Sequence, residues 1–398
     1  MTYSAHLIEI DNLSSAEAAL LKVGADPAGV KIMAPKSVFR VVKLKNVPSV
    51  AANILKQEIL SYGGEAANAY GALNLSVETT DLLICATLAQ FEKLLIKLKQ
   101  HQFGLPALAE EIRSALANYD AAPPPLKIGP KEFNFGSRTY IMGILNVTPD
   151  SFSDGGKYWT PREAAEAAKK MVLDGADIID IGGQSTRPGS KEIPVEEELG
   201  RVIPVIEKLN QEDLLISVDT YRSAVAEAAL AAGAHMINDI SGLHFDPNLA
   251  KVCAKYQVPL VLMHIKGTPQ NMQTAPTYQD LIAEILAYLS ESVQLAKAAG
   301  VKDVIVDPGF GFGKTVEHNL EILRNLRSFK SLGRPLLIGT SRKSSIGEVL
   351  GLPVASRTFG TAATIAVAIS AGVDIIRVHD VSEMAQVAKM TDAVVRRG

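Results

Sequence analysis

A regular alternation of short apolar runs and helical stretches begins near Leu126 and continues to the C-terminus, and it constrains the fold more than any other feature. Continuous apolarity, rather than alternation of apolar and polar residues, is typical of strands buried on both faces. Such runs occur at residues 140–145, 177–181, 214–218, 235–238, 259–263, 303–306, 335–338 and 374–378. They predict eight strands within one domain.

Helical stretches separate these runs, among them 160–173, 220–232, 278–299 and 361–371. Several end at a glycine just before the next strand, as at Gly175, Gly233 and Gly372, which is a typical helix stop. Eight strand–helix units in about 270 residues predict an α/β fold, a (β/α)8 TIM barrel. A doubly wound open sheet is the alternative, but the number of units argues against it.

Residues 1–120 predict a separate, small α/β domain, for which the sequence indicates no role. Its strands are expected at 6–10, 38–44 and 81–86, and helices at 91–99 and 108–116. Ser14 and Glu17 have capping-box spacing for a first helix, and Pro48 suits the first turn of a later one. The Pro-rich segment 121–125 indicates a stiff linker, so the barrel is expected to span 126–398.

The overall charge argues against a nucleic-acid partner. The formal net charge is -3 and the pI is near 6.2, so any anion site must be a local cluster of Arg and Lys. Cys85 and Cys253 lie far apart in apolar surroundings, which indicates reduced thiols in a cytoplasmic protein. The sequence shows no signal peptide and no long uncharged apolar span, so we expect no membrane association.

Polar residues follow every predicted strand, and the C-terminal strand ends of a (β/α)8 barrel form its active site. The first strand leads into a polar loop, 146–156, which begins with Asn146. The other ends contribute the loop after Gly182 and the residues Asp219, Asn238, His264, Asp307, Lys343, Arg377 and His379.

One group of these residues suits an anion. Arg187, Lys343, Arg377 and His379 gather positive charge, which suits a phosphate or a diphosphate. Asn146 could offer a carbonyl oxygen to a hydrated Mg²⁺ beside that anion.

A second group suits the edge of a planar ring. Asp219, Asn238 and Asp307 supply acceptors and one donor, and a carboxylate can accept two parallel N–H bonds from an amino-pyrimidinone edge. A pterin or a purine has such an edge. Ile240 and Met263 could pack on the faces of the ring.

Other polar residues also have structural interpretations. His264 follows a strand directly and could support its neighbours instead of binding a ligand. His235 and His318 are expected to be structural, and Asp239 and Asp380 could serve only in turns or caps.

Seven motifs occur in the order found in the dihydropteroate synthase family, which the chain resembles from about Phe133 to its C-terminus. They are NVTPDSFSDGG at 146–156, STRPG at 185–189, VDT at 218–220, INDISG at 237–242, DPGFGFGK at 307–314, SRKS at 341–344 and RVH at 377–379. The resemblance implies a homodimeric (β/α)8 barrel of folate synthesis that uses Mg²⁺. It would join 6-hydroxymethyl-7,8-dihydropterin diphosphate to p-aminobenzoate and release diphosphate.

The resemblance also implies roles for single residues. The pterin would be held by Asp219, Asn238, Asp307 and Lys343. The diphosphate and Mg²⁺ would be held by Asn146, Arg377 and His379. The p-aminobenzoate side would be shaped by Thr186, Arg187, Pro188, Phe312 and Ser344. Phe152 and Asp154 would lie on a mobile first loop that closes over the site with a second loop, 185–191. The expected catalytic residues are Lys343, Arg377, His379, Asp219 and Asp307.

The implied reaction agrees with the physical chemistry of the residues. Clustered cations and Mg²⁺ would stabilise the leaving diphosphate, and an arylamine is neutral and nucleophilic at pH 7, so no strong general base is expected. Gln184 stands where the family commonly has Glu, and residues 1–120 fall outside the resemblance.

Two alternative functions stay open. A pterin-barrel methyltransferase acting on a methylated folate would not need the segments 186–188 and 341–344. A non-catalytic pterin-binding module would not need the diphosphate ligands Asn146, Arg377 and His379.

Overall fold

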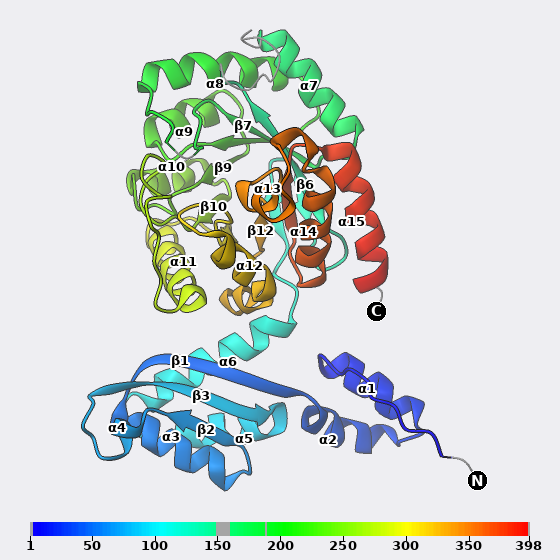
Figure 1. Ribbon diagram of the computed structural model, residues 1–398, viewed down its shortest axis with the longest axis vertical. Coiled ribbons are helices and arrows are strands. Elements are labelled where there is room, and N and C mark those ends of the chain that lie inside the picture. Colours follow the sequence, from blue (N-terminus) through cyan, green and yellow to red (C-terminus); the bar gives the residue numbers. More distant parts are fainter. Residues whose placement is uncertain (1–2, 149–159, 188, 397–398) are drawn as a thin grey trace. The chain divides into compact units, whose positions relative to one another are not determined.

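The structure is a computed structural model that describes residues 3–148, 160–187 and 189–396. The chain forms two compact units, Met1–Asp120 and Ala121–Gly398. Each unit has a hydrophobic core of its own, and Figure 1 shows the elements of both.

The described part of the second unit contains an eight-stranded sheet of parallel strands in the order β11-β10-β9-β8-β7-β6-β13-β12. A parallel bridge between Val306 and Leu336 brings the two ends of this sheet together. The strands are β6 (Tyr140–Asn146), β7 (Ile178–Gly182), β8 (Ile216–Asp219), β9 (Met236–Asp239), β10 (Leu260–Met263), β11 (Val304–Asp307), β12 (Leu337–Ile338) and β13 (Ile375–Val378). Each overlaps one predicted apolar run, so the predicted (β/α)8 barrel is confirmed.

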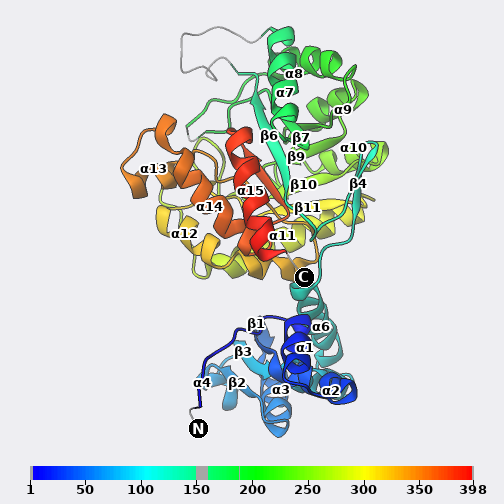
Figure 2. The same ribbon diagram turned by 90° about the vertical axis from the view of Figure 1, so that its right-hand side faces the viewer.

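Helices surround the strands in both views (Figure 1, Figure 2). They are α7 (Pro161–Leu173), α8 (Val195–Leu209), α9 (Ser223–Ala231), α10 (Asn248–Tyr256), α11 (Leu281–Ala298), α12 (Val316–Arg324), α13 (Ser344–Leu350), α14 (Thr358–Ser370) and α15 (Val381–Val395), with 3-10 turns η2 (Leu326–Leu332) and η3 (Val354–Ser356). Gly175 and Gly233 follow α7 and α9 with φ values of +112° and +114°, which confirms them as helix stops.

Apolar side chains fill the inside of the barrel toward the N-terminal ends of its strands. This cluster takes one residue from each strand or the position beside it: Met142, Ile178, Leu215, Met236, Val261, Ile305, Leu337 and Ile375. The hairpin of β4 (Leu126–Ile128) and β5 (Lys131–Phe133) packs against the same cluster. Because this end is apolar, the polar strand residues gather at the other end.

The first unit is a three-stranded antiparallel sheet with helices. Its elements are α1 (Leu13–Lys22), α2 (Pro27–Ser37), β1 (Phe39–Pro48), α3 (Ser49–Ser61), β2 (Glu65–Asn68), α4 (Tyr70–Leu73), β3 (Thr79–Thr87), α5 (Leu88–Leu98) and α6 (Leu105–Asp120). The strand order is β1-β3-β2, and residues of the sheet share a core with α3, α5 and α6.

Three expectations for this unit were wrong. Residues 6–10 form no strand, because Leu7 is fully exposed and the segment has no partner in the sheet. Helix α1 begins earlier than the Ser14 signal suggests, because the Asn12 side chain accepts from the Ser15 amide and the Ser15 hydroxyl accepts from the Asn12 amide. Pro48 ends β1 and precedes α3 instead of starting it.

Candidate active site

Arg377 lies at the centre of a buried ion-pair cluster where the barrel strands end. Its Nε donates to Asp180 Oδ2 at 2.6 Å, and its Nη2 donates to Asp219 Oδ2 at 2.7 Å. Asn238 Nδ2 donates to the same Asp180 oxygen at 2.9 Å. Strands β13, β7, β8 and β9 thus bring four polar side chains together. The guanidinium compensates two carboxylates that would be costly to bury alone.

Asp180 is a site residue that sequence reasoning missed. It lies inside the apolar run 177–181 and is fully buried. A charge within a strand that is expected to be buried needs a partner, and this signal could have identified Asp180.

The Oδ1 atoms of Asp180 and Asp219 have no hydrogen-bond partner among the described residues. An N–H group of a ligand would satisfy such an acceptor.

Asp307 and Lys343 influence each other's ionisation. The Gly309 amide donates to Asp307 Oδ1 at 2.7 Å. Burial raises the pKa of Asp307 to about 6, although the Gly309 amide and the charge of Lys343 lower it. Burial, with help from Arg377, lowers the pKa of Lys343 to about 8, against the carboxylates of Asp307 and Asp219. Burial also raises the pKa of Asp219, against the charge of Arg377.

Apolar groups that were expected to line the ligand rings are close together. Ile240, Met263 and Phe312 belong to one buried cluster at the polar end of the barrel. Lys343 Nζ lies 4.0 Å from the centre of the Phe312 ring. Gly311 has a φ of +84°, and a Cβ there would lie 3.0 Å from Lys343 Cδ, so the loop requires glycine at this position.

His379 supplies no positive charge at neutral pH. Burial, together with the charges of the neighbouring Arg377 and Arg342, lowers its pKa to about 3. Its Nδ1 lies 2.9 Å from Ser341 Oγ. The expected cation at His379 is thus corrected to a neutral imidazole, because water cannot solvate the charged form there. Ser344 is exposed at the start of α13.

Asn146 can contribute one oxygen to a metal site. It is the half-buried last residue of β6, and a Cβ on Gly182 would lie 3.1 Å from its Oδ1. Within the described residues, no three His, Cys, Asp or Glu side chains form a metal-binding group. Substrate and water oxygens could complete the shell of a metal beside Asn146. Mg²⁺ is commonly bound in that way, so the residues present fit it.

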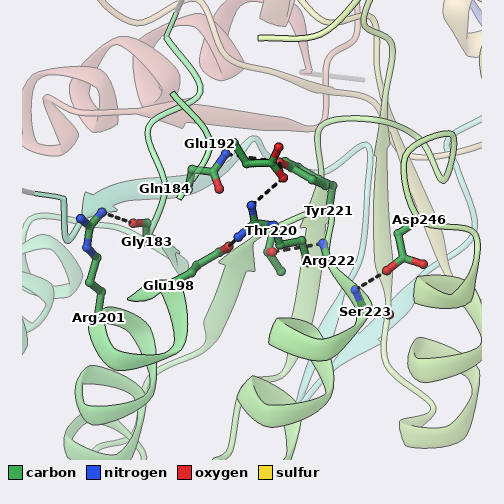
Figure 3. Close-up of polar contacts among 10 residues, drawn as sticks. All are labelled: Gly183, Gln184, Glu192, Glu198, Arg201, Thr220, Tyr221, Arg222, Ser223 and Asp246. Carbon is green, nitrogen blue, oxygen red and sulfur yellow. Dashed lines mark hydrogen bonds and ion pairs between the residues drawn. The ribbon is translucent and has the colours of Figure 1, made fainter. Parts of the chain in front are cut away.

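A network of polar side chains anchors the end of the second loop (Figure 3). Arg222 donates to Glu192 at 2.7 Å and to the buried Glu198 at 2.9 Å. Tyr221 Oη donates to Glu192 at 3.3 Å, and Gln184 Nε2 donates to Tyr221 Oη at 3.3 Å. Sequence reasoning missed this network. The amide of Gln184 acts here as a donor, which an ionised Glu could not do.

Of the remaining loop residues that were expected in the site, the structure describes two. Thr186 is half-buried and Arg187 is exposed. Further along the loop, the Gly189 amide donates to the Pro269 carbonyl at 3.0 Å. Phe152, Asp154 and Pro188 lie outside the described residues.

His264 supports the Gly-rich loop that follows β11. Lys314 Nζ lies 2.8 Å from His264 Nδ1 and donates to the Phe312 carbonyl at 3.0 Å. Burial, together with the charge of Lys314, lowers the pKa of His264 to about 2, so the imidazole is neutral. The structure therefore fits the interpretation in which His264 supports its neighbours instead of binding a ligand.

The fold and this arrangement of carboxylates, Asn238 and cations define a pterin-binding barrel enzyme. Residues 142–379 match the family model described as Pterin binding enzyme. More specifically, the chain belongs to the dihydropteroate synthase family, and it is a transferase of folate synthesis.

Curated and solved relatives carry that name. The dihydropteroate synthase of Synechocystis sp. is 53% identical over 281 residues, which are 70% of this chain and 97% of that protein. The crystal structure of the Yersinia pestis enzyme with a sulfonamide drug complex has a TM-score of 0.65 at 43% identity, covering 68% of this chain and 99% of that one. The Clostridium difficile enzyme, solved in the presence of pteroic acid, has a TM-score of 0.63 at 50% identity, covering 67% and 100%.

A longer relative also matches the first unit. The probable bifunctional folylpolyglutamate synthase/dihydropteroate synthase of Halobacterium salinarum is 42% identical over 390 residues, which are 97% of this chain and 46% of that protein. The shorter matches leave most of residues 1–120 uncovered. No helix in the described ranges is both long and apolar enough to span a membrane.

Proposed function

We propose that this chain joins 6-hydroxymethyl-7,8-dihydropterin diphosphate to p-aminobenzoate, giving 7,8-dihydropteroate and diphosphate. The observation that carries the proposal is the buried set of Asp180, Asp219, Asn238 and Asp307 beside Arg377. The unpartnered Oδ1 of Asp219 and the carboxylate of Asp307 would accept N–H groups of the pterin edge. Ile240 and Met263 would pack on the ring.

The reaction breaks the bond between the pterin methylene carbon and the diphosphate oxygen, and that electron pair leaves with the diphosphate. The lone pair of the p-aminobenzoate nitrogen forms the new C–N bond, and the amine proton passes to diphosphate or water. Lys343 and Arg377 would stabilise the developing negative charge. His379, being neutral, would donate a hydrogen bond without adding charge.

We also propose Mg²⁺ as the metal, with Asn146, at the end of β6, as a protein ligand. When bound, Mg²⁺ would supply positive charge to the leaving diphosphate. Phe312 and Ser344, with Thr186, Arg187 and Pro188 from the second loop, would hold p-aminobenzoate. Phe152 and Asp154 of the first loop would exclude water, which competes with the amine.

A homodimer and a cytoplasmic location complete the proposal. Large apolar side chains are exposed on α14 and α15, which pack together: Phe359 is 89% exposed, Val367 51%, Met390 66% and Val394 68%. Such a patch suits contact with a second copy of the chain. The free thiols of Cys85 and Cys253 suit a reducing compartment.

Incubation with the pterin diphosphate, p-aminobenzoate and Mg²⁺ tests the proposal. We expect equal amounts of dihydropteroate and diphosphate. Transfer of a methyl group from a methylated folate, or binding of the pterin without diphosphate release, would instead support one of the two alternatives. Sedimentation of the full chain and of Phe359→Ser tests the dimer, which the substitution should weaken.

A further inference from the structure

Asn319 is a buried residue of α12 that joins two loops of the candidate active site. It is 1% exposed. Its Oδ1 accepts from the Gly311 amide at 2.7 Å, and its Nδ2 donates to Ser345 Oγ at 2.8 Å. We infer that Asn319 is a positioning residue that holds the Gly-rich loop 308–314 in register with the loop 341–344. The inference rests on the proposed function, since these loops carry groups assigned to p-aminobenzoate.

Both anchor points lie beside functional groups. Gly311 directly precedes Phe312, and Ser345 directly follows Ser344. Lys343 Nζ lies over the Phe312 ring at 4.0 Å, and a Cβ on Gly311 would lie only 3.0 Å from Lys343 Cδ, so the two loops pack closely here. A small shift of one loop against the other would therefore change where the Phe312 ring and the Lys343 ammonium meet the substrates.

A purely local role explains only part of this arrangement. Asn319 Nδ2 also donates to the Thr315 carbonyl at 2.8 Å, four residues earlier, where α12 begins. That bond would serve the helix alone. The other two bonds reach residues 8 and 26 positions away: Gly311 lies in the Gly-rich loop, and Ser345 lies in the first turn of α13, directly after the loop 341–344. The side chain is thus satisfied only when both loops are in place.

Two variants and a control separate positioning from stability. Asn319→Leu removes both loop contacts, and Ser345→Ala removes one of them while Asn319 keeps Gly311 and Thr315. Thr139→Val is the control, because it removes another buried hydroxyl, bonded to Asp392 Oδ1 at 2.8 Å, at the start of β6 and away from the site. The double variant Asn319→Leu/Ser345→Ala tests whether the two side chains act as one unit.

Steady-state kinetics with each substrate varied is the first readout. We expect Ser345→Ala and Asn319→Leu to lower kcat/KM for p-aminobenzoate by about tenfold or more, because misplaced groups lose orientation. The double variant should be no worse than Asn319→Leu, and Thr139→Val should stay within about twofold. A folded Ser345→Ala variant with unchanged kcat/KM would overturn the inference. A double variant whose loss in kcat/KM is the product of the two single losses would overturn it as well. If Asn319→Leu fails to fold, Ser345→Ala alone decides between these outcomes.

Hydrogen exchange of the full chain is the second readout, and it does not depend on turnover. We expect peptides covering 308–314 and 341–346 to exchange faster in Asn319→Leu, whereas Thr139→Val should leave them unchanged. Unchanged exchange in both peptides would contradict the inference. If the unaltered chain releases no diphosphate, the proposed function fails, and the exchange experiment still reports on the two loops.

Discussion

The guanidinium of Arg377 is 2.6 Å from the carboxylate of Asp180, and both side chains lie inside the barrel. Removal of one partner from a buried ion pair typically costs roughly 3–5 kcal/mol, because the remaining charge is left uncompensated. Asp180→Asn should cost less than that, since Arg377 also binds Asp219.

We expect Asp180→Asn to lower the free energy of unfolding by about 2 kcal/mol and to weaken pterin binding. Chemical denaturation and calorimetric titration with the pterin would measure the two effects. Asp177→Asn is a matched control, because Asp177 pairs with Arg138 at the opposite end of β7, where Arg138 is half-exposed. An equal loss of pterin affinity in both variants would show that the Arg377–Asp180 pair has no special role in the site.

Lys343→Ala should abolish most activity and leave the fold intact. The ammonium lies beside Asp307 and Asp219, and its loss removes a cation that the diphosphate is expected to need. A loss of about 10²–10³ in kcat is typical for removal of one such electrostatic contact. Kinetics and circular dichroism would measure both properties. An unfolded Lys343→Ala would mean that Lys343 is a structural residue.

Much of the fold could be predicted because the barrel strands are buried on both faces. Runs such as 259–263 are apolar throughout, and glycines such as Gly233 end the preceding helices. In the first unit, residues 6–10 have β-forming side chains, yet they form no strand because no neighbouring strand pairs with them. The β-forming propensity of residues 6–10 alone could not reveal that no neighbouring strand pairs with them.

The candidate site could be predicted only where residues follow strand ends. Asp219, Asn238 and Asp307 were selected because barrel geometry brings such positions together. Asp180 was missed because it lies within a strand, and Asn319 because it lies within a helix. Their partners Arg377 and Ser345 are distant in sequence, so no local pattern reports these contacts.

The activity should fall in acid as Asp307 becomes protonated. Burial raises the pKa of Asp307 to about 6, and a protonated carboxyl can no longer accept two N–H bonds from the pterin. We expect kcat/KM for the pterin diphosphate to decline below about pH 6. A pH–rate profile would measure this decline. The pH values 5 and 7 lie about one unit either side of that pKa. A kcat/KM that does not change between them would contradict the role assigned to Asp307.

The same carboxyl should make the free protein less stable as pH rises. Its folded pKa of about 6 is above the value of about 3.9 expected in the unfolded chain, so the folded state binds more protons between these two values. The free energy of unfolding should therefore fall from about pH 4 to about pH 6, by up to about 3 kcal/mol from this group. Asp239 and Asp374 have similarly raised pKa values and should add to the slope. Asp307→Asn should make the slope shallower in urea denaturation.

The second unit should be active without the first. The two units have separate cores, and the Synechocystis relative matches over 97% of its own length while covering 70% of this chain. A shortened chain that begins at Ala121 keeps Leu126, whose side chain belongs to the barrel core. We expect its kcat/KM to stay within about twofold of the full chain, since no group of the first unit is assigned to the reaction. A loss beyond that, in a folded protein, would assign residues 1–120 a part in activity.

Removal of Mg²⁺ should stop the reaction reversibly. With Asn146 as the proposed protein ligand, a hydrated ion would be held weakly, so a chelator should remove it and added Mg²⁺ should restore the activity. Asn146→Ala should raise the Mg²⁺ concentration needed for half-maximal activity by about tenfold, because one ligand is lost while the substrate oxygens remain. Titration of activity with Mg²⁺ in both proteins would measure this shift. The control Asn325→Ala alters an amide whose Nδ2 donates to the Glu321 carbonyl near the end of α12, and it should leave the Mg²⁺ requirement unchanged. Equal Mg²⁺ requirements in Asn146→Ala and the unaltered chain would exclude Asn146 as the metal ligand.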